Sequence, residues 1–234
     1  MVAVEEPLLA LRGFGVGFGE GNRALMAVRG VDLTLRPGET VGIVGESGCG
    51  KSVLSQSILR LLEHDQSIRY QGCVEFKGLD ITSIPLSEMR NVRGSGIAMV
   101  FQDPQSSFDP LCGVGLQISE AIRSHKDVSR KEASCLAVRA MNSVGIECAE
   151  KRFKSRPDTF SGGQLQRLMI AMATALGPEV LIADEPTTAL DTTTQAEILN
   201  LLSSLVEKQK AAMLFVSHDL NVVSNVCERV NVMY

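Results

Sequence analysis

The stretch from Gly45 to Ser52 (GESGCGKS) constrains this chain more than any other. The residues before it, Thr40 to Val44, are apolar and mostly β-branched, which predicts a parallel strand buried on both faces. From Lys51 to Leu62 the apolar residues recur at helical spacing. The stretch is therefore predicted to be a turn from a buried strand into a helix, which places the chain among the α/β proteins.

The residue types of this turn are typical of a phosphate-binding loop. Glycines allow successive backbone N–H groups to point inward, and the start of a helix adds a partial positive charge. Lys51 is predicted to reach the outer phosphates of a nucleoside triphosphate, and the Ser52 hydroxyl to ligate Mg²⁺. A solvated loop is the alternative, but it does not account for the flanking strand and helix. The predicted phosphate-binding residues are Gly45, Glu46, Ser47, Gly48, Cys49, Gly50, Lys51 and Ser52.

The bulk properties of the 234 residues exclude several classes of protein. The formal net charge is −4 and no basic run is present, so nucleic acid is not an expected partner. The composition is 44% hydrophobic but only 4% aromatic, which favours an aliphatic parallel sheet with packed helices. The six cysteines form no C-x-x-C pair, which predicts a reducing compartment and no zinc site. No apolar run approaches the roughly 18 residues of a membrane span, so membrane contact is expected only through a partner.

The rest of the chain is predicted to alternate strands and helices. Two strands at its start, Leu8 to Phe18 and Ala27 to Leu35, are expected to pair antiparallel across the turn Gly19 to Arg23. A wholly helical pattern from Gly113 to about Pro157 indicates an inserted helical subdomain. The final apolar strand, Arg229 to Tyr234, stops without a polar tail, which indicates a fragment of a longer chain. The other expected strands are Arg69 to Phe76, Gly96 to Val100, Val180 to Ala183 and Met213 to Val216.

Two carboxylates and two further polar residues follow these predicted strands. Asp184 and Glu185 come directly after Val180 to Ala183, where a first carboxylate can hold Mg²⁺ and a second can accept a proton from attacking water. Gln102 and His218 follow the strands on either side in the chain, and ligands of open α/β sheets gather at such strand ends. The alternatives are two surface acids, a loop glutamine and a structural histidine.

Two other segments offer ligand contacts. Ser161, Gly162, Gly163 and Gln164 begin a predicted helix that runs to Leu176, and a helix start with two glycines can receive an anion. By itself this pattern is weak, because many helices begin with Ser or Gly. Phe18 stands before a loop, where a flat ring can stack on a purine, although its spacing alone favours a core position at the end of a strand.

The ordered set GESGCGKS, FQDPQ, FSGGQ, VLIADEP, ALD and FVSHD closely resembles the ATP-binding cassette (ABC) family over nearly the whole chain. The resemblance implies an α/β fold with a RecA-like core, an antiparallel β-subdomain near the N-terminus and a helical insert. It assigns residues 1–102 and 165–234 to the ATP-binding core and 103–164 to the helical subdomain. Two cassettes of this family close head to tail around two ATP molecules.

The resemblance also implies a role for each matching residue. Phe18 would stack on adenine, Gln102 would sense Mg²⁺ and the membrane permease, and Asp184 would bind magnesium. Glu185 would be the catalytic base, His218 the switch histidine, and Asp191 part of the loop along the dimer interface. Ser161 to Gln164 would complete the ATP site of the partner cassette. This sequence has Phe160 where leucine is usual and Cys49 where serine is more common.

The stretches FQDPQSSFDP and QLQRLMIAMATAL are similar to those of oligopeptide, dipeptide and nickel importers. This similarity implies an ATPase that works with two integral membrane permease subunits, a second cassette, identical or different, and an extracytoplasmic solute-binding protein. Its location would be cytoplasmic, at the inner face of the cell membrane. Three alternatives stay open: an exporter or lipoprotein-release cassette, a soluble cassette ATPase unrelated to transport, and a regulatory cassette without enzymatic activity.

Cys49 allows a direct test of the predicted phosphate-binding loop. It stands close to Lys51 at a predicted helix N-terminus, where a cysteine is a reactive nucleophile. We predict that N-ethylmaleimide modifies Cys49 and blocks ATP binding, whereas Cys49→Ser still binds ATP after the same treatment. Titration with a fluorescent ATP analogue measures this, and an equal loss in both proteins would contradict it.

Overall fold

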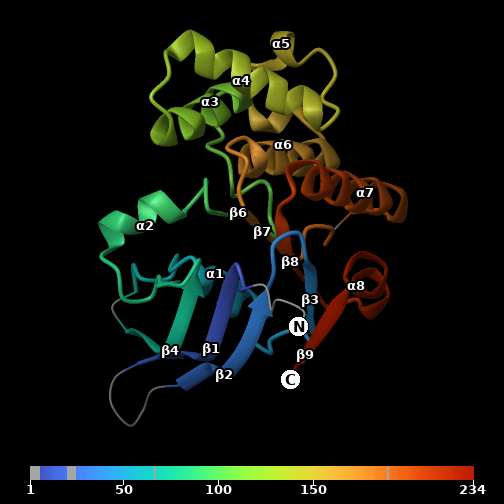
Figure 1. Cartoon of the computed structure of the whole chain (residues 1–234). Coiled ribbons are helices and arrows are strands. Elements are labelled where there is room, and N and C mark those ends of the chain that lie inside the picture. The colour runs from blue at the N-terminus through green and yellow to red at the C-terminus, as the bar shows by residue number, and fades with distance from the viewer. Residues whose placement is uncertain (1–5, 20–24, 66, 189) are drawn as a thin grey trace.

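The computed structural model describes residues 6–19, 25–65, 67–188 and 190–234, and it contains two sheets and a group of helices (Figure 1). The first half of the chain forms β1 (Leu9–Phe18), β2 (Leu25–Leu35), β3 (Thr40–Gly45), α1 (Lys51–Ile58), β4 (Ile68–Phe76), β5 (Leu79–Asp80), α2 (Leu86–Val92) and β6 (Ile97–Val100). The second half forms α3 (Val114–His125), α4 (Arg130–Ser143), α5 (Ala149–Arg152), η2 (Pro157–Thr159), α6 (Gly162–Thr174), β7 (Val180–Asp184), α7 (Thr192–Gln209), β8 (Ala212–Ser217), α8 (Leu220–Val226) and β9 (Arg229–Met233).

A five-stranded sheet in the order β6-β7-β8-β3-β9 carries the core, and all its neighbouring strands are parallel. Successive residues of its inner strands enter two different apolar clusters, because side chains alternate between the two faces of a strand. In β8, for example, Leu214 and Val216 pack on one side, while Met213 and Phe215 pack on the other. The prediction of strands buried on both faces is confirmed.

A second sheet, in the order β2-β1-β4-β5, is antiparallel and lies at the bottom of the view in Figure 1. The predicted antiparallel pairing of β1 with β2 is therefore correct, while residues 20–23 of the expected turn lie outside the described residues. Helix α1 contacts strands of both sheets. The helix that begins at the phosphate-binding loop is thus held between two sheets.

The helices α3, α4 and α5 gather at the top of Figure 1, away from the antiparallel sheet, where the sequence predicted a helical insert. Helix α6 packs against α3 and α4 and also against strand β6. The boundary expected between residues 164 and 165 therefore falls inside one continuous helix that links the helical part to the parallel sheet.

Helix α1 ends at Ile58, four residues before the predicted end at Leu62. Arg60 adopts a positive φ of 54°, and its N–H and that of Leu61 bond to the carbonyls of Ser57 and Gln56. These two bonds form a Schellman cap, a position where glycine is usual. The buried Arg60 guanidinium donates to the carbonyl of Ile81 and pairs with Glu63, so tertiary contacts end the helix without the expected glycine.

Within the described residues, none of the helices combines the length and the apolar character needed to cross a membrane.

Candidate active site

The loop between β3 and α1 curls tightly around its own backbone. Gly48 and Gly50 have φ values of 85° and 97°, a region that residues with a Cβ rarely occupy. A Cβ at Gly50 would also lie 2.5 Å from the carbonyl oxygen of Ala27. Glycine is therefore required at this position, and the backbone is free to approach a ligand closely.

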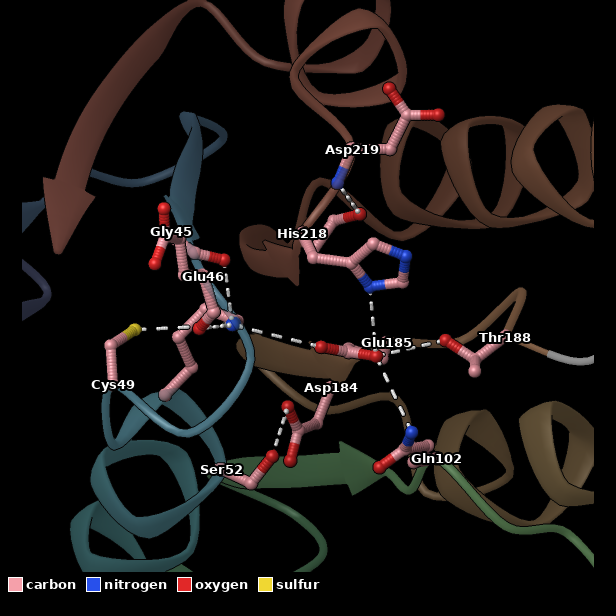
Figure 2. Close-up of polar contacts among 12 residues, drawn as sticks. Gly45, Glu46, Cys49, Ser52, Gln102, Asp184, Glu185, Thr188, His218 and Asp219 are labelled. Atoms are coloured by element: carbon pink, nitrogen blue, oxygen red, sulfur yellow. Dashed lines mark hydrogen bonds and ion pairs between the residues drawn. The ribbon is translucent and has the colours of Figure 1, made fainter. Parts of the chain in front are cut away.

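Lys51 begins helix α1, and its side chain is only 4% exposed. The Nζ atom donates hydrogen bonds of 2.8 Å to each of two loop carbonyls, those of Gly45 and Glu46. It also lies 3.8 Å from Oε1 of Glu185 (Figure 2). A buried ammonium needs such partners, and they hold this one between the loop and the end of strand β7.

Ser52 and Asp184 bring a hydroxyl and a carboxylate together. Ser52 Oγ donates to Asp184 Oδ1 at 3.2 Å, and the Asp184 side chain is almost fully buried at 2% exposure. Burial raises the pKa of Asp184, and the hydrogen bond from Ser52 opposes that shift only in part. Both groups are hard oxygen donors, the type that Mg²⁺ prefers, so these residues fit that ion. Among the described residues no set of three or more His, Cys, Asp or Glu could hold a metal alone, but Mg²⁺ commonly completes its shell with substrate phosphates.

Glu185 is the centre of the cluster in Figure 2, where two donors and a ring nitrogen of His218 approach a single oxygen of its carboxylate. Its Oε2 accepts from Thr188 Oγ1 at 2.9 Å and from Gln102 Nε2 at 3.3 Å, and it lies 3.1 Å from Nδ1 of His218. Its backbone has a positive φ of 46°, and its N–H bonds to the carbonyl of Val216. An unusual backbone conformation of this kind is typical of functional sites.

The parallel sheet explains why these side chains meet. Gln102 follows β6, Asp184 ends β7 with Glu185 directly after it, and His218 follows β8, while Lys51 and Ser52 follow β3. The carboxyl ends of these strands share one edge of the sheet. A cavity of about 380 Å³ opens at this edge, lined by Ser52, Gln56, Phe101, Gln102, Asp103, Ser106, Ser107 and Asp184.

The exposed residues Ser161 and Gly162 lie where α6 begins, as the sequence predicted. Ser161 Oγ accepts from the Gln164 N–H, and the Gln164 side chain accepts in return from the Ser161 N–H, which is a complete capping box. No hydrogen bond or ion pair between described residues joins Ser161, Gly162, Gly163 or Gln164 to the phosphate-binding loop of the same chain.

Phe18 and Asp191 also lie outside the cluster around Glu185. Phe18 ends β1 and is half-buried against the core between the two sheets. Asp191 caps helix α7 by accepting from the N–H groups of Thr193 and Thr194, and the bond from Thr194 lowers the pKa of Asp191 most. In this conformation Phe18 packs against the core and Asp191 caps a helix of the same chain.

Sequence reasoning missed two residues of the site. Thr188 donates to Glu185, and Arg152 stacks its guanidinium 3.8 Å from the centre of the Phe160 ring. Arg152 also donates to Gln164 Oε1, so helix α5 supports the start of α6. The aromatic ring at position 160 provides the surface for this cation–π contact. Cys49, which sequence reasoning did single out, is partly exposed with its Sγ 3.9 Å from Lys51 Nζ.

Comparison with known proteins identifies one family. The model for the ABC transporter family matches residues 28–188. The oligopeptide transport ATP-binding protein OppD of Bacillus subtilis (strain 168) is 46% identical over 227 residues, which is 97% of this chain but 63% of that protein. The dipeptide transport ATP-binding protein DppD of the same strain is 44% identical and is covered to 68%. The chain thus spans less than two thirds of the length of OppD and about two thirds of the length of DppD.

Solved structures agree with this match. A dimeric structure of MJ0796, a bacterial ABC transporter cassette, superposes with a TM-score of 0.82 at 29% identity, covering 96% of this chain and 94% of that one. A second dimeric structure of MJ0796, in a post-hydrolysis state bound to ADP and Pi, gives a TM-score of 0.81 with the same coverage. The predicted fold, with a parallel core, an antiparallel β-subdomain and a helical insert, is confirmed.

The burial of Asp184 leads to a prediction about stability. The pKa of Asp184 is raised in the folded chain above the ordinary 3.8. The folded state therefore loses stability as the pH rises from 3.8 through the raised pKa. We expect Asp184→Asn to raise the thermal unfolding midpoint of the nucleotide-free chain at pH 8, because it removes a buried charge but keeps an acceptor for Ser52. The gain should shrink as the pH falls toward 3.8, because the raised pKa lets the buried Asp184 carboxylate take up a proton above that pH.

Differential scanning fluorimetry across this pH range measures the effect. Asp219→Asn is a suitable control, because Asp219 also follows a parallel strand but is less buried. A midpoint for Asp184→Asn that is equal to or below that of the unmodified chain at pH 8 would contradict the prediction.

Proposed function

Because the chain belongs to the ABC transporter family, we propose that it is the ATP-binding and ATP-hydrolysing subunit of a peptide importer. The observation that carries the enzymatic part is the position of the Glu185 carboxylate, between the buried Lys51 and the side chains of Gln102 and His218. Peptide cargo is supported by the likeness to oligopeptide and dipeptide transport proteins, and it is favoured over nickel for that reason.

ATP binding would use the curled loop and the start of α1. The N–H groups around Gly48 and Gly50 and the ammonium of Lys51 provide donors and charge for the phosphates. Ser52 and Asp184 would hold Mg²⁺, which when bound neutralises charge that develops on the β- and γ-phosphates. Phe18 would stack on the adenine, since its ring is only half-buried at the end of β1.

Hydrolysis would proceed by direct attack of water on the γ-phosphorus. The Glu185 carboxylate accepts the proton of that water as the new P–O bond forms and the bond to the β–γ bridging oxygen breaks, which yields ADP and phosphate. Gln102 and His218 orient Glu185 through the contacts that both make with Oε2. The buried Lys51 stabilises the charge of the transferred group.

Two cassettes would share each ATP. The N-terminal end of α6, with Ser161, Gly162, Gly163 and Gln164, is exposed and suits the γ-phosphate held by a partner cassette. Asp191, at the exposed start of α7, would run along the same interface. Both structures of the similar cassette MJ0796 are dimeric, which supports this pairing. The second cassette would be either a copy of this chain or a different one.

The remaining partners follow from the transport role. Closure of two cassettes on ATP, and their opening after hydrolysis, would drive two integral membrane permease subunits, which receive peptide from an extracytoplasmic solute-binding protein. The cassette would lie in the cytoplasm against the inner face of the membrane. Residues 103–164 would form the helical subdomain, with 1–102 and 165–234 as the ATP-binding core.

Changing the base and the phosphate-binding lysine separates binding from chemistry. We expect Glu185→Gln to bind ATP with Mg²⁺ and to accumulate as a closed dimer, because it lacks only the proton acceptor. Lys51→Ala should weaken ATP binding itself, since it removes the charge that faces the phosphates. Phosphate release and size-exclusion chromatography with ATP measure both. Wild-type turnover in Glu185→Gln would exclude its role as base.

The transport role is tested by purifying the tagged full-length protein from membranes of its native host and identifying co-purifying proteins by mass spectrometry. Two integral membrane subunits, another cassette and a solute-binding protein are the expected result. Permease subunits without a solute-binding protein would favour an exporter or a lipoprotein-release complex. Only soluble partners would exclude transport and leave the ATPase assignment intact.

A further inference from the structure

The two oxygens of the Glu185 carboxylate lie in different surroundings. Oε2 accepts from Thr188 and Gln102 and faces His218, whereas Oε1 lies toward the loop side, 3.8 Å from Lys51 Nζ. We propose that Thr188 is a positioning residue, whose hydroxyl fixes Oε2 so that Oε1 is the atom that takes the proton from water. This inference rests on the proposed ATPase activity.

The three groups around Oε2 differ in where they come from. Gln102 and His218 are 83 and 33 residues away in sequence and belong to the ends of other strands. Thr188 is three residues from Glu185, and its N–H bonds to the carbonyl of Glu185 at 3.2 Å, so both belong to one turn. A movement of β6 or β8 relative to β7 changes the first two contacts but leaves the contact from Thr188 in place.

The Glu185 side chain is 12% exposed on a largely buried turn, but its direction still has to be fixed. The backbone of Glu185 is fixed by its bond to Val216, but the side-chain torsions are not fixed by backbone contacts. A freely rotating glutamate side chain would spend little time with Oε1 directed at the loop. Fixing that side chain costs conformational entropy. The Thr188 bond, at 2.9 Å the shortest of the three contacts to Oε2, supplies this order in advance.

The capacity of the carboxylate decides which oxygen reacts. A carboxylate has about two acceptor positions on each oxygen, so the Thr188 hydroxyl and the Gln102 amide together occupy Oε2. Oε1 has only the more distant Lys51 Nζ within ion-pair range among the described residues. The new O–H bond therefore forms on Oε1, while Thr188 keeps its own proton and transfers none.

Thr188→Val tests this role, because valine has nearly the same shape but no hydroxyl. We expect kcat for ATP to fall about ten-fold or more, as for the loss of a hydrogen bond to a charged acceptor, with the Kd of ATP unchanged. Thr188→Ser retains the donor and should recover most of the activity. Thr82→Val is a matched control, since Thr82 also donates to a carboxylate two residues away, Asp80, but lies remote from β7 in the chain.

The assay uses the full-length chain in its membrane complex, with phosphate release for kcat and a fluorescent ATP analogue for Kd. In a Glu185→Gln background, Thr188→Val should cause no further loss of turnover, because its effect acts through Glu185. A purely structural role for Thr188 would instead raise Kd and lower the unfolding midpoint of Thr188→Val together.

Three results would overturn the inference: kcat of Thr188→Val within about two-fold of wild type, Thr188→Ser as slow as Thr188→Val, or an added loss in the Glu185→Gln background. Failure of the proposed function is distinguishable. It would appear as absent Mg²⁺-dependent hydrolysis in the unmodified protein, before any change at Thr188.

Discussion

The buried ammonium of Lys51 is the interaction on which the site depends. A cation at 4% exposure is tolerated only with partners, and here two carbonyls of the preceding loop and the carboxylate of Glu185 provide them. The loop can supply those carbonyls because Gly48 and Gly50 adopt positive φ values. Strand β3 and helix α1 fix its two ends, and the two sheets hold α1 in turn. The pairing of the Lys51 ammonium therefore depends both on the glycines of the loop and on the packing of β3 and α1 in the core.

The order of the parallel strands determines which chemistry surrounds that charge. Because β7 and β8 lie between β6 and β3, the residues that follow all four strands meet at one edge. At this edge two neighbouring carboxylates, those of Asp184 and Glu185, lie in different surroundings. Asp184 is buried and its pKa is raised, which suits a group that awaits a cation, whereas Glu185 beside it is held by neutral and cationic donors. Two adjacent carboxylates therefore have different environments and, in the proposed mechanism, different roles.

Much of this arrangement could be predicted from the sequence, because its signals are local. Apolar runs predicted the parallel strands, and the polar residues that follow these runs within two positions include Gln102, Asp184, Glu185 and His218. The features that could not be predicted depend on tertiary contacts. Arg60 ends α1 without a glycine because its guanidinium is bound by residues about 20 positions further on. Thr188 and Arg152 carry no signal of their own, since a threonine in a turn and an arginine near a helix end are common on any surface.

The hydrogen bonds to Glu185 differ in how they depend on the rest of the fold. Thr188 shares a turn with Glu185, so its contact persists whenever that turn is folded. Gln102 opens the irregular stretch between β6 and α3, the connection from the parallel sheet to the helical part of the chain. In the proposed mechanism, a displacement of those helices that moves this stretch would weaken the bond from Gln102 to Oε2 without altering the direction of Oε1. A contact at 3.3 Å is the easiest of the three to lose, so in the proposed mechanism the helical part can influence Glu185 while its carboxylate stays aligned.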